Sequence, residues 1–152
     1  YEKNGLRMLP EYKVLELINK LLLEEKIIIL GGAQIDFEHN EDYRKKLNYH
    51  PRLINAAGKL SLAESAYLFK HADHVYTSDC GAMHIAVACN LQHKLTTIFG
   101  PSNPRHILPP TYLDFAIWGD QDIYSTNYQL YGKIRRKEPA YFIDLDIYHL
   151  GE

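Results

Sequence analysis

The feature that most constrains the fold of this chain is the alternation of short apolar runs with segments of helical periodicity. The run Lys26–Leu30 is short and almost wholly apolar, which is typical of a strand buried on both faces of a parallel sheet. Similar runs occur at 53–55, 75–77, 95–99 and 115–118. Strands that alternate with helices form right-handed βαβ units, so the sequence predicts an α/β fold with a doubly wound parallel sheet.

Helix signals occupy the segments before and between these runs. Pro10 stands where a first helical turn tolerates proline, and apolar residues then recur with helical spacing from 14 to 22. Ser61 and Glu64 form a capping-box pattern that predicts a helix ending near His71. We expect further helices at 38–47 and 82–89.

Composition excludes several classes of protein. A chain of 152 residues fits one domain, predicted over 1–152 with an irregular tail at 120–152. Seventeen basic and nineteen acidic residues give a net charge of −2, which does not favour a nucleic-acid partner. The basic run 133–137 is interpreted as a solvated tail, and a peripheral contact with an anionic membrane surface is left open. No apolar run is long enough for a transmembrane segment.

The two cysteines and the N-terminal residues bear on the compartment. Cys80 and Cys89 indicate neither a disulfide framework nor a zinc site. Residues 1–5 have no apolar core of the kind that a signal peptide needs. His71 and His74 are interpreted as surface residues, and we expect no metal. The composition therefore favours a reducing, cytoplasmic location.

The turn after the third predicted strand carries the richest candidate site. Ligands of parallel α/β sheets bind at the carboxyl ends of strands, where free N–H groups of a following helix attract anions. Gly81 permits close backbone approach or a positive φ, and unpaired N–H groups from Gly81 to Met83 favour a diphosphate. Asp79 can cap the helix, and His84 in its first turn can donate to phosphate. The alternative is that Asp79 is only a cap and His84 only a half-buried, partnered histidine.

These residues resemble the most diagnostic segment of the ADP-heptose:lipopolysaccharide heptosyltransferases, which form glycosyltransferase family 9. The family segment is D-[ST]-G-x-x-H-x-A-A-A, and residues 79–88 are D-C-G-A-M-H-I-A-V-A. Three further segments match in the same order. A-G-K-L-S-L at 57–62 is similar to G-K-x-S-L, I-F-G-P-S-N-P at 98–104 to F-G-P-T-[DN]-P, and R-M-L-P at 7–10 to K-x-[WL]-P.

The resemblance implies the C-terminal, donor-binding half of a GT-B glycosyltransferase, with a Rossmann-like fold. It assigns Asp79, Cys80, Gly81 and His84 to the diphosphate and sugar of a nucleotide-sugar donor. Lys59 and Leu60 would lie beside the nucleotide base and ribose, mostly through backbone, and Arg7 would replace a phosphate-binding lysine. The family chemistry implies no cofactor and no metal.

The same resemblance implies that the chain is a fragment of a larger two-domain enzyme. The acceptor, a lipopolysaccharide core or related glycan, and the catalytic base would then be held by an N-terminal domain. No catalytic residue is assigned here, and we expect no sugar transfer by this chain alone. A glycolipid acceptor would place the enzyme at the inner face of the bacterial inner membrane.

Two departures from the family pattern keep alternatives open. Cys80 replaces a Ser or Thr, so a weak thiol donor stands where a hydroxyl is usual. It is interpreted as a small pocket residue, and a reactive thiol at a helix N-terminus is the alternative. Arg7 keeps the charge of lysine but not its geometry.

The residues also bear on functional classes other than a transferase. A non-catalytic nucleotide- or sugar-binding module is the alternative that these substitutions favour. A dehydrogenase or epimerase of the Rossmann type is disfavoured because no G-x-G-x-x-G follows a predicted strand. In an adaptor or structural protein, the residues of the candidate site could be substituted without an effect on ligand binding.

Overall fold

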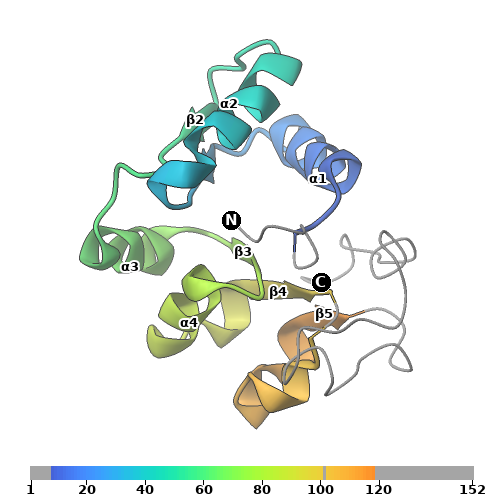
Figure 1. Cartoon of the computed structure of the whole chain (residues 1–152), viewed down its shortest axis with the longest axis vertical. Helices are drawn as coiled ribbons and strands as arrows, with labels where there is room; N and C mark the ends of the chain where they lie inside the picture. The colour runs from blue at the N-terminus through green and yellow to red at the C-terminus, as the bar shows by residue number, and fades with distance from the viewer. Residues whose placement is uncertain (1–7, 101, 119–152) are drawn as a thin grey trace. The chain divides into compact units, whose positions relative to one another are not determined.

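The computed structural model describes residues 8–100 and 102–118 (Figure 1). The chain divides into two compact units, with Glu11–Ser65 in the first and Ala66 onward, with residues 8–10, in the second. Each unit has its own parallel sheet and its own hydrophobic core. Within the described ranges, no helix has both the length and the apolar character needed to cross a bilayer.

The first unit joins two helices to two parallel strands. Its elements are α1 (Glu11–Leu23), β1 (Ile28–Leu30), the 3-10 helix η1 (Gln34–Asp36), α2 (Phe37–Lys46) and β2 (Leu53–Asn55). Ile28 and Leu53 are register partners, and Ile18 of α1 and Tyr43 of α2 join them in one buried cluster. Both helices therefore bury apolar residues against one face of the strand pair. Lys46 near the end of α2 also forms a salt bridge with Glu11 at the start of α1.

α3 (Leu62–His71) begins in the first unit and ends in the second, and both of its ends have side-chain caps. Ser61 Oγ accepts from the Glu64 N–H at 3.3 Å, and the Glu64 carboxylate accepts from the Ser61 N–H at 2.8 Å. These two bonds are the predicted capping box. At the other end, Lys94 Nζ donates to the carbonyl of Lys70 at 2.6 Å. A cation thus supplies a hydrogen-bond donor to a carbonyl at the C-terminal end of the helix.

The second unit contains a three-stranded parallel sheet in the order β3-β4-β5. Its remaining elements are β3 (Val75–Ser78), α4 (Gly81–Ala88), η2 (Gln92–Lys94), β4 (Leu95–Phe99), η3 (Pro104–His106), η4 (Pro110–Phe115) and β5 (Ala116–Trp118). β4 is the central strand, and all five of its residues are buried. Burial on both faces explains why this strand is a continuous apolar and threonine run in the sequence.

The core of the second unit lies between this sheet and α4 (Figure 1). Met83 and Ala86 of α4 are completely buried and share one cluster with Val75, Leu95 and Phe99 of the strands. Val75 and Leu95 are register partners, so they point to the same face. This packing holds α4 rigidly at the carboxyl end of β3.

The predicted parallel α/β architecture is confirmed, and five strands lie where the apolar runs predicted them. The boundaries shift slightly: β1 begins at Ile28 and β5 at Ala116, because Phe115 belongs to η4. Among the described residues the strands pair as two sheets, β1-β2 and β3-β4-β5. The prediction of a single domain over 1–152 stays a prediction, and the predicted tail at 120–152 lies outside the described residues.

Candidate functional site

The turn between β3 and α4 carries four of the predicted donor-site residues. Ser78 is the last residue of β3 and Gly81 the first of α4, so the strand passes into the helix through only two residues. Asp79 is buried, with 6% of its surface exposed. Cys80, Gly81 and His84 are exposed. Buried and exposed groups thus alternate around the first turn of α4.

The first N–H groups of α4 are open to a ligand. Within the described part of the chain, the N–H groups of Gly81 and Ala82 have no hydrogen-bond acceptor. A Cβ added at Gly81 would have no neighbouring atom within 4 Å. The backbone at Gly81 is therefore uncovered, as the prediction of close approach requires. The alternative of a positive φ at Gly81 is wrong, since Gly32 and Gly58 are the positive-φ glycines of the described segments.

The prediction that Asp79 caps α4 is also wrong. The N-cap residue is Cys80, whose backbone is extended with φ −153° and ψ 179°, and its side chain makes no capping bond. The helix begins one residue later than a cap at Asp79 requires. The Met83 N–H instead donates to the Cys80 carbonyl at 3.1 Å. The thiol of Cys80 is free and exposed.

In the first unit, the loop after β2 has a sharply defined backbone. The Ala57 N–H donates to the Asn55 side-chain oxygen at 3.1 Å, which forms a turn of the kind that asparagine favours. Gly58 has a φ of +69°, and a Cβ there would lie 2.8 Å from the Cα of Gln34. The loop can therefore adopt this shape only with glycine at 58.

The internal bonds of this loop decide which backbone groups a ligand could use. The N–H groups of Ala56, Ala57, Gly58 and Lys59 all donate to oxygens of the first unit. By contrast, the Leu60 N–H and the carbonyls of residues 57–59 have no partner among the described residues. Backbone contacts of the nucleotide with Lys59 and Leu60 stay a prediction, for which the Leu60 N–H and the carbonyls of both residues have no partner among the described residues.

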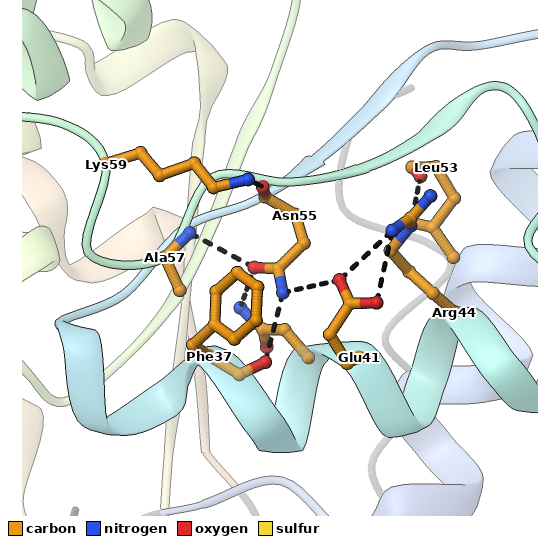
Figure 2. A network of polar contacts seen from close by, with 8 residues as sticks. Phe37, Glu41, Arg44, Leu53, Asn55, Ala57 and Lys59 are labelled. Atoms are coloured by element: carbon orange, nitrogen blue, oxygen red, sulfur yellow. Dashed lines mark hydrogen bonds and ion pairs between the residues drawn. The ribbon is translucent and has the colours of Figure 1, made fainter.

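The charged end of Lys59 turns back onto its own loop. Lys59 Nζ donates to the Asn55 carbonyl at 3.0 Å and lies 5.3 Å from the centre of the Phe37 ring (Figure 2). Leu60 is 38% exposed. A ligand beside this loop would therefore meet backbone and the Leu60 side chain before it met a free ammonium group.

A network of polar contacts that the sequence does not predict lies between the loop and α2 (Figure 2). Asn55 Nδ2 donates to the Phe37 carbonyl at 3.0 Å and to Glu41 Oε1 at 2.8 Å. Glu41 also accepts from Arg44 at 3.1 Å, and Arg44 Nε donates to the Leu53 carbonyl at 3.0 Å. The hydrogen bond from Asn55, followed by those from Arg44, holds the pKa of the Glu41 carboxyl below its usual value. In the sequence, the one sign of this network is an asparagine, Asn55, that precedes the turn containing Gly58.

The predicted site residues fall into three groups. Asp79, Cys80, Gly81 and His84 lie on one turn of the second unit, whereas Lys59 and Leu60 lie on a loop of the first unit. Arg7 lies outside the described residues.

In the loop after β4, the side chain of Asn103 caps the 3-10 helix η3. Ser102 is buried, and the Asn103 side chain accepts from the Arg105 N–H at 3.0 Å. The Arg105 guanidinium lies 5.5 Å from the centre of the Trp118 ring.

The fold and the comparison with known proteins identify the family of this chain. Parallel strands that pass through short glycine turns into helices define a Rossmann-like α/β protein. The chain belongs to glycosyltransferase family 9 (heptosyltransferase), whose sequence model matches residues 7–132.

Several relatives are named heptosyltransferases. Lipooligosaccharide heptosyltransferase 2 of Haemophilus influenzae is 32% identical over 102 residues, which cover 66% of this chain and 29% of that protein. Lipopolysaccharide heptosyltransferase 2 of Escherichia coli is 31% identical over 102 residues, which again cover 66% of this chain and 29% of that protein. The solved structure of E. coli ADP-heptose lps heptosyltransferase II superposes with a TM-score of 0.66 at 27% identity, covering 79% of this chain and 36% of that one. The chain therefore matches less than half the length of these relatives, and over the matched part its α/β fold is that of the GT-B heptosyltransferase structure.

Proposed function

We propose that this chain is the donor-binding part of a heptosyltransferase that acts in lipopolysaccharide biosynthesis. The donor would be a nucleotide-diphosphate sugar, ADP-heptose in particular, and the acceptor a lipopolysaccharide core or related glycan. Family membership supports glycosyl transfer, and the name of the E. coli structure supports ADP-heptose as the donor. A cytoplasmic location, at the membrane face where a glycolipid acceptor lies, goes with this proposal.

The observation that carries the proposal is the open start of α4. The backbone N–H groups of Gly81 and Ala82, which have no acceptor among residues 8–100 and 102–118, lie beside the exposed side chains of Cys80 and His84. A helix N-terminus carries partial positive charge, so it stabilises the negative charge of a diphosphate. His84 is one helical turn from Cys80 and can donate a hydrogen bond to the same phosphate.

In this reaction the acceptor hydroxyl attacks the anomeric carbon of the sugar and loses its proton to a base. The bond from that carbon to the diphosphate oxygen breaks, and the nucleoside diphosphate leaves with the extra negative charge. The residues of the α4 turn would stabilise that charge as it develops. The base would belong to another part of the enzyme, so we expect no transfer by this chain alone.

A non-catalytic nucleotide-binding module is the second candidate. Cys80 favours it, because an exposed thiol stands at the N-cap where the family pattern has a hydroxyl. Such a module would bind the nucleotide equally well, and only a transfer assay on the full-length protein separates the two candidates.

A thermal-shift experiment tests the binding site. The chain is heated alone and with ADP, ADP-heptose, UDP, GDP or NAD, at about 100 times the dissociation constant, where bound ligand adds about 2.7 kcal/mol to the free energy of unfolding. We expect a shift with ADP and ADP-heptose that is lost in His84→Ala and Gly81→Ala. His71→Ala, an exposed histidine elsewhere, is the matched control. A shift that survives both substitutions would place the nucleotide elsewhere and overturn the proposed site.

A further inference from the structure

We infer that Asn55 and Glu41 are positioning residues that hold the loop at 56–60 in the shape required for the nucleotide. The inference rests on the proposed function and on the resemblance to glycosyltransferase family 9, which assigns backbone contacts with the nucleotide to Lys59 and Leu60. The Asn55 side chain points from the loop toward α2, where it meets Glu41 (Figure 2), so both residues would act through the backbone of the loop.

The Asn55 carboxamide uses its full hydrogen-bonding capacity inside the protein. Its two N–H groups donate to Phe37 O and Glu41 Oε1, and its oxygen accepts from Ala57 N at 3.1 Å and Asn40 Nδ2 at 3.4 Å. A primary amide has two donors and two lone pairs, so no bond is left for a ligand. Only 3% of the residue is exposed. Asn55 therefore fastens α2 to the loop and cannot itself contact substrate.

Glu41 fixes the orientation of that amide. Because the carboxylate only accepts, it requires the Asn55 NH₂ group to face α2 and leaves the oxygen facing Ala57. Arg44 holds the carboxylate from the other side, at 3.1 and 3.2 Å, and donates to the Leu53 carbonyl at the start of β2. An amide turned the other way would lose its bonds to both Glu41 and Ala57.

The backbone groups that remain free on the loop depend on this orientation. The Ala57 N–H donates to Asn55, and Lys59 Nζ is held at the Asn55 carbonyl. These two bonds enclose residues 57–59, whose carbonyls have no partner among the described residues and could accept from a nucleotide. Loss of the Asn55–Glu41 bond would let those acceptors move without removing any of them.

The test combines hydrogen exchange of the ligand-free chain with ADP titration. Glu41→Gln keeps the size of the side chain but removes its charge and gives it an NH₂ group. We expect faster exchange of the Ala57 N–H and an ADP affinity about tenfold lower. Glu38→Gln, the same change at an exposed position of the same helix, should leave both quantities as in wild type. Thermal midpoints identify any variant that has lost its fold.

A rescue variant separates positioning from general stabilisation. Asn55→Asp places two carboxylates against each other and should weaken ADP binding at least as much as Glu41→Gln. The double variant Asn55→Asp/Glu41→Gln restores a donor opposite an acceptor, so we expect it to recover part of the affinity and slow the exchange again. If the two substitutions only destabilise the fold, the double variant should instead lose the sum of the affinities that the two single variants lose.

The outcomes distinguish this inference from the proposed function. If wild type binds no ADP, the proposed function fails, and the role of the network in ligand binding fails with it. If wild type binds ADP but Glu41→Gln binds it equally well, the proposed function stands and the positioning role is overturned. Unchanged exchange at Ala57 in Glu41→Gln overturns the positioning role whatever the nucleotide does.

Discussion

His74 Nε2 lies 2.8 Å from Thr96 Oγ1, so a ring just before β3 is hydrogen-bonded to the middle strand of the sheet. The His74 ring also lies 4.5 Å from the ring of Tyr76. Burial lowers the pKa of the His74 imidazole from its usual value. The folded protein therefore favours the neutral ring at this position.

The first prediction is that acid destabilises the second unit through His74. The unfolded chain binds a proton near pH 6.5, before the folded chain does, so the stability from neutral His74 is present above that pH. It is lost as the pH falls through the lower pKa of the folded state. Unfolding followed by the fluorescence of Trp118, the only tryptophan, measures this between about pH 7.5 and 5.5. His74→Gln should flatten the profile, whereas His71→Gln, on the surface, should leave it steep.

The second prediction concerns two neighbouring threonines of β4 that differ in one respect. Each is 1% exposed, but Thr96 bonds to His74, whereas Thr97 Oγ1 has no hydrogen-bond partner among the described residues. Valine has nearly the shape of threonine without the polar group. Thr97→Val should therefore raise the free energy of unfolding by about 1 kcal/mol, since a buried unpaired hydroxyl is removed.

Thr96→Val is the matched control and should act in the opposite direction. It leaves the His74 nitrogen without its partner, at a cost of about 1–2 kcal/mol. Denaturant unfolding of both variants, again followed by Trp118, measures the difference. If both variants lose the same free energy of unfolding, strand packing and not hydrogen bonding determines the effect of valine at both positions.

The third prediction tests how α4 is anchored. Met83 is completely buried and adjoins the exposed His84, so one helical turn carries both a core residue and a candidate ligand contact. Met83→Ala should cost about 2–5 kcal/mol of unfolding free energy through the cavity that it leaves. Met83→Leu keeps the volume and should cost less than about 1.5 kcal/mol. A small loss in the alanine variant would mean that the core refills the space.

The sequence predicts those parts of the fold that depend on interactions between residues close together in the chain. The strands at 53–55 and 95–99 and the capping box at Ser61 follow from residues adjacent in the chain, and all three are confirmed. The predicted helix at 82–89 starts one residue too late, since α4 begins at Gly81, and the predicted cap at Asp79 lies one residue too early. Asp79 and Cys80 can both precede a helix, and only the backbone angles identify Cys80 as the cap.

The parts that were missed depend on partners distant in sequence. Asn55 and Glu41 are fourteen residues apart and meet only because α2 packs beside β2. Nothing in the periodicity of α2 marks Glu41 as different from the exposed Glu38. The separation of the strands into two sheets is likewise a matter of which strands pair, and apolar runs of similar length do not specify their neighbours.

The last prediction concerns Gly58, where the shape of the loop requires glycine twice over. Its φ of +69° is strained for any residue with a Cβ, and that Cβ would press on the backbone of Gln34. Gly58→Ala should therefore lower the free energy of unfolding of the first unit by roughly 1–3 kcal/mol. Gly31→Ala is the matched control, because a Cβ there would have no neighbour within 4 Å, and it should stay within about 0.5 kcal/mol of wild type. Hydrogen exchange of β1 and β2 measures both variants. If they exchange alike, the loop relaxes around the new methyl group and its shape is less constrained than the structure indicates.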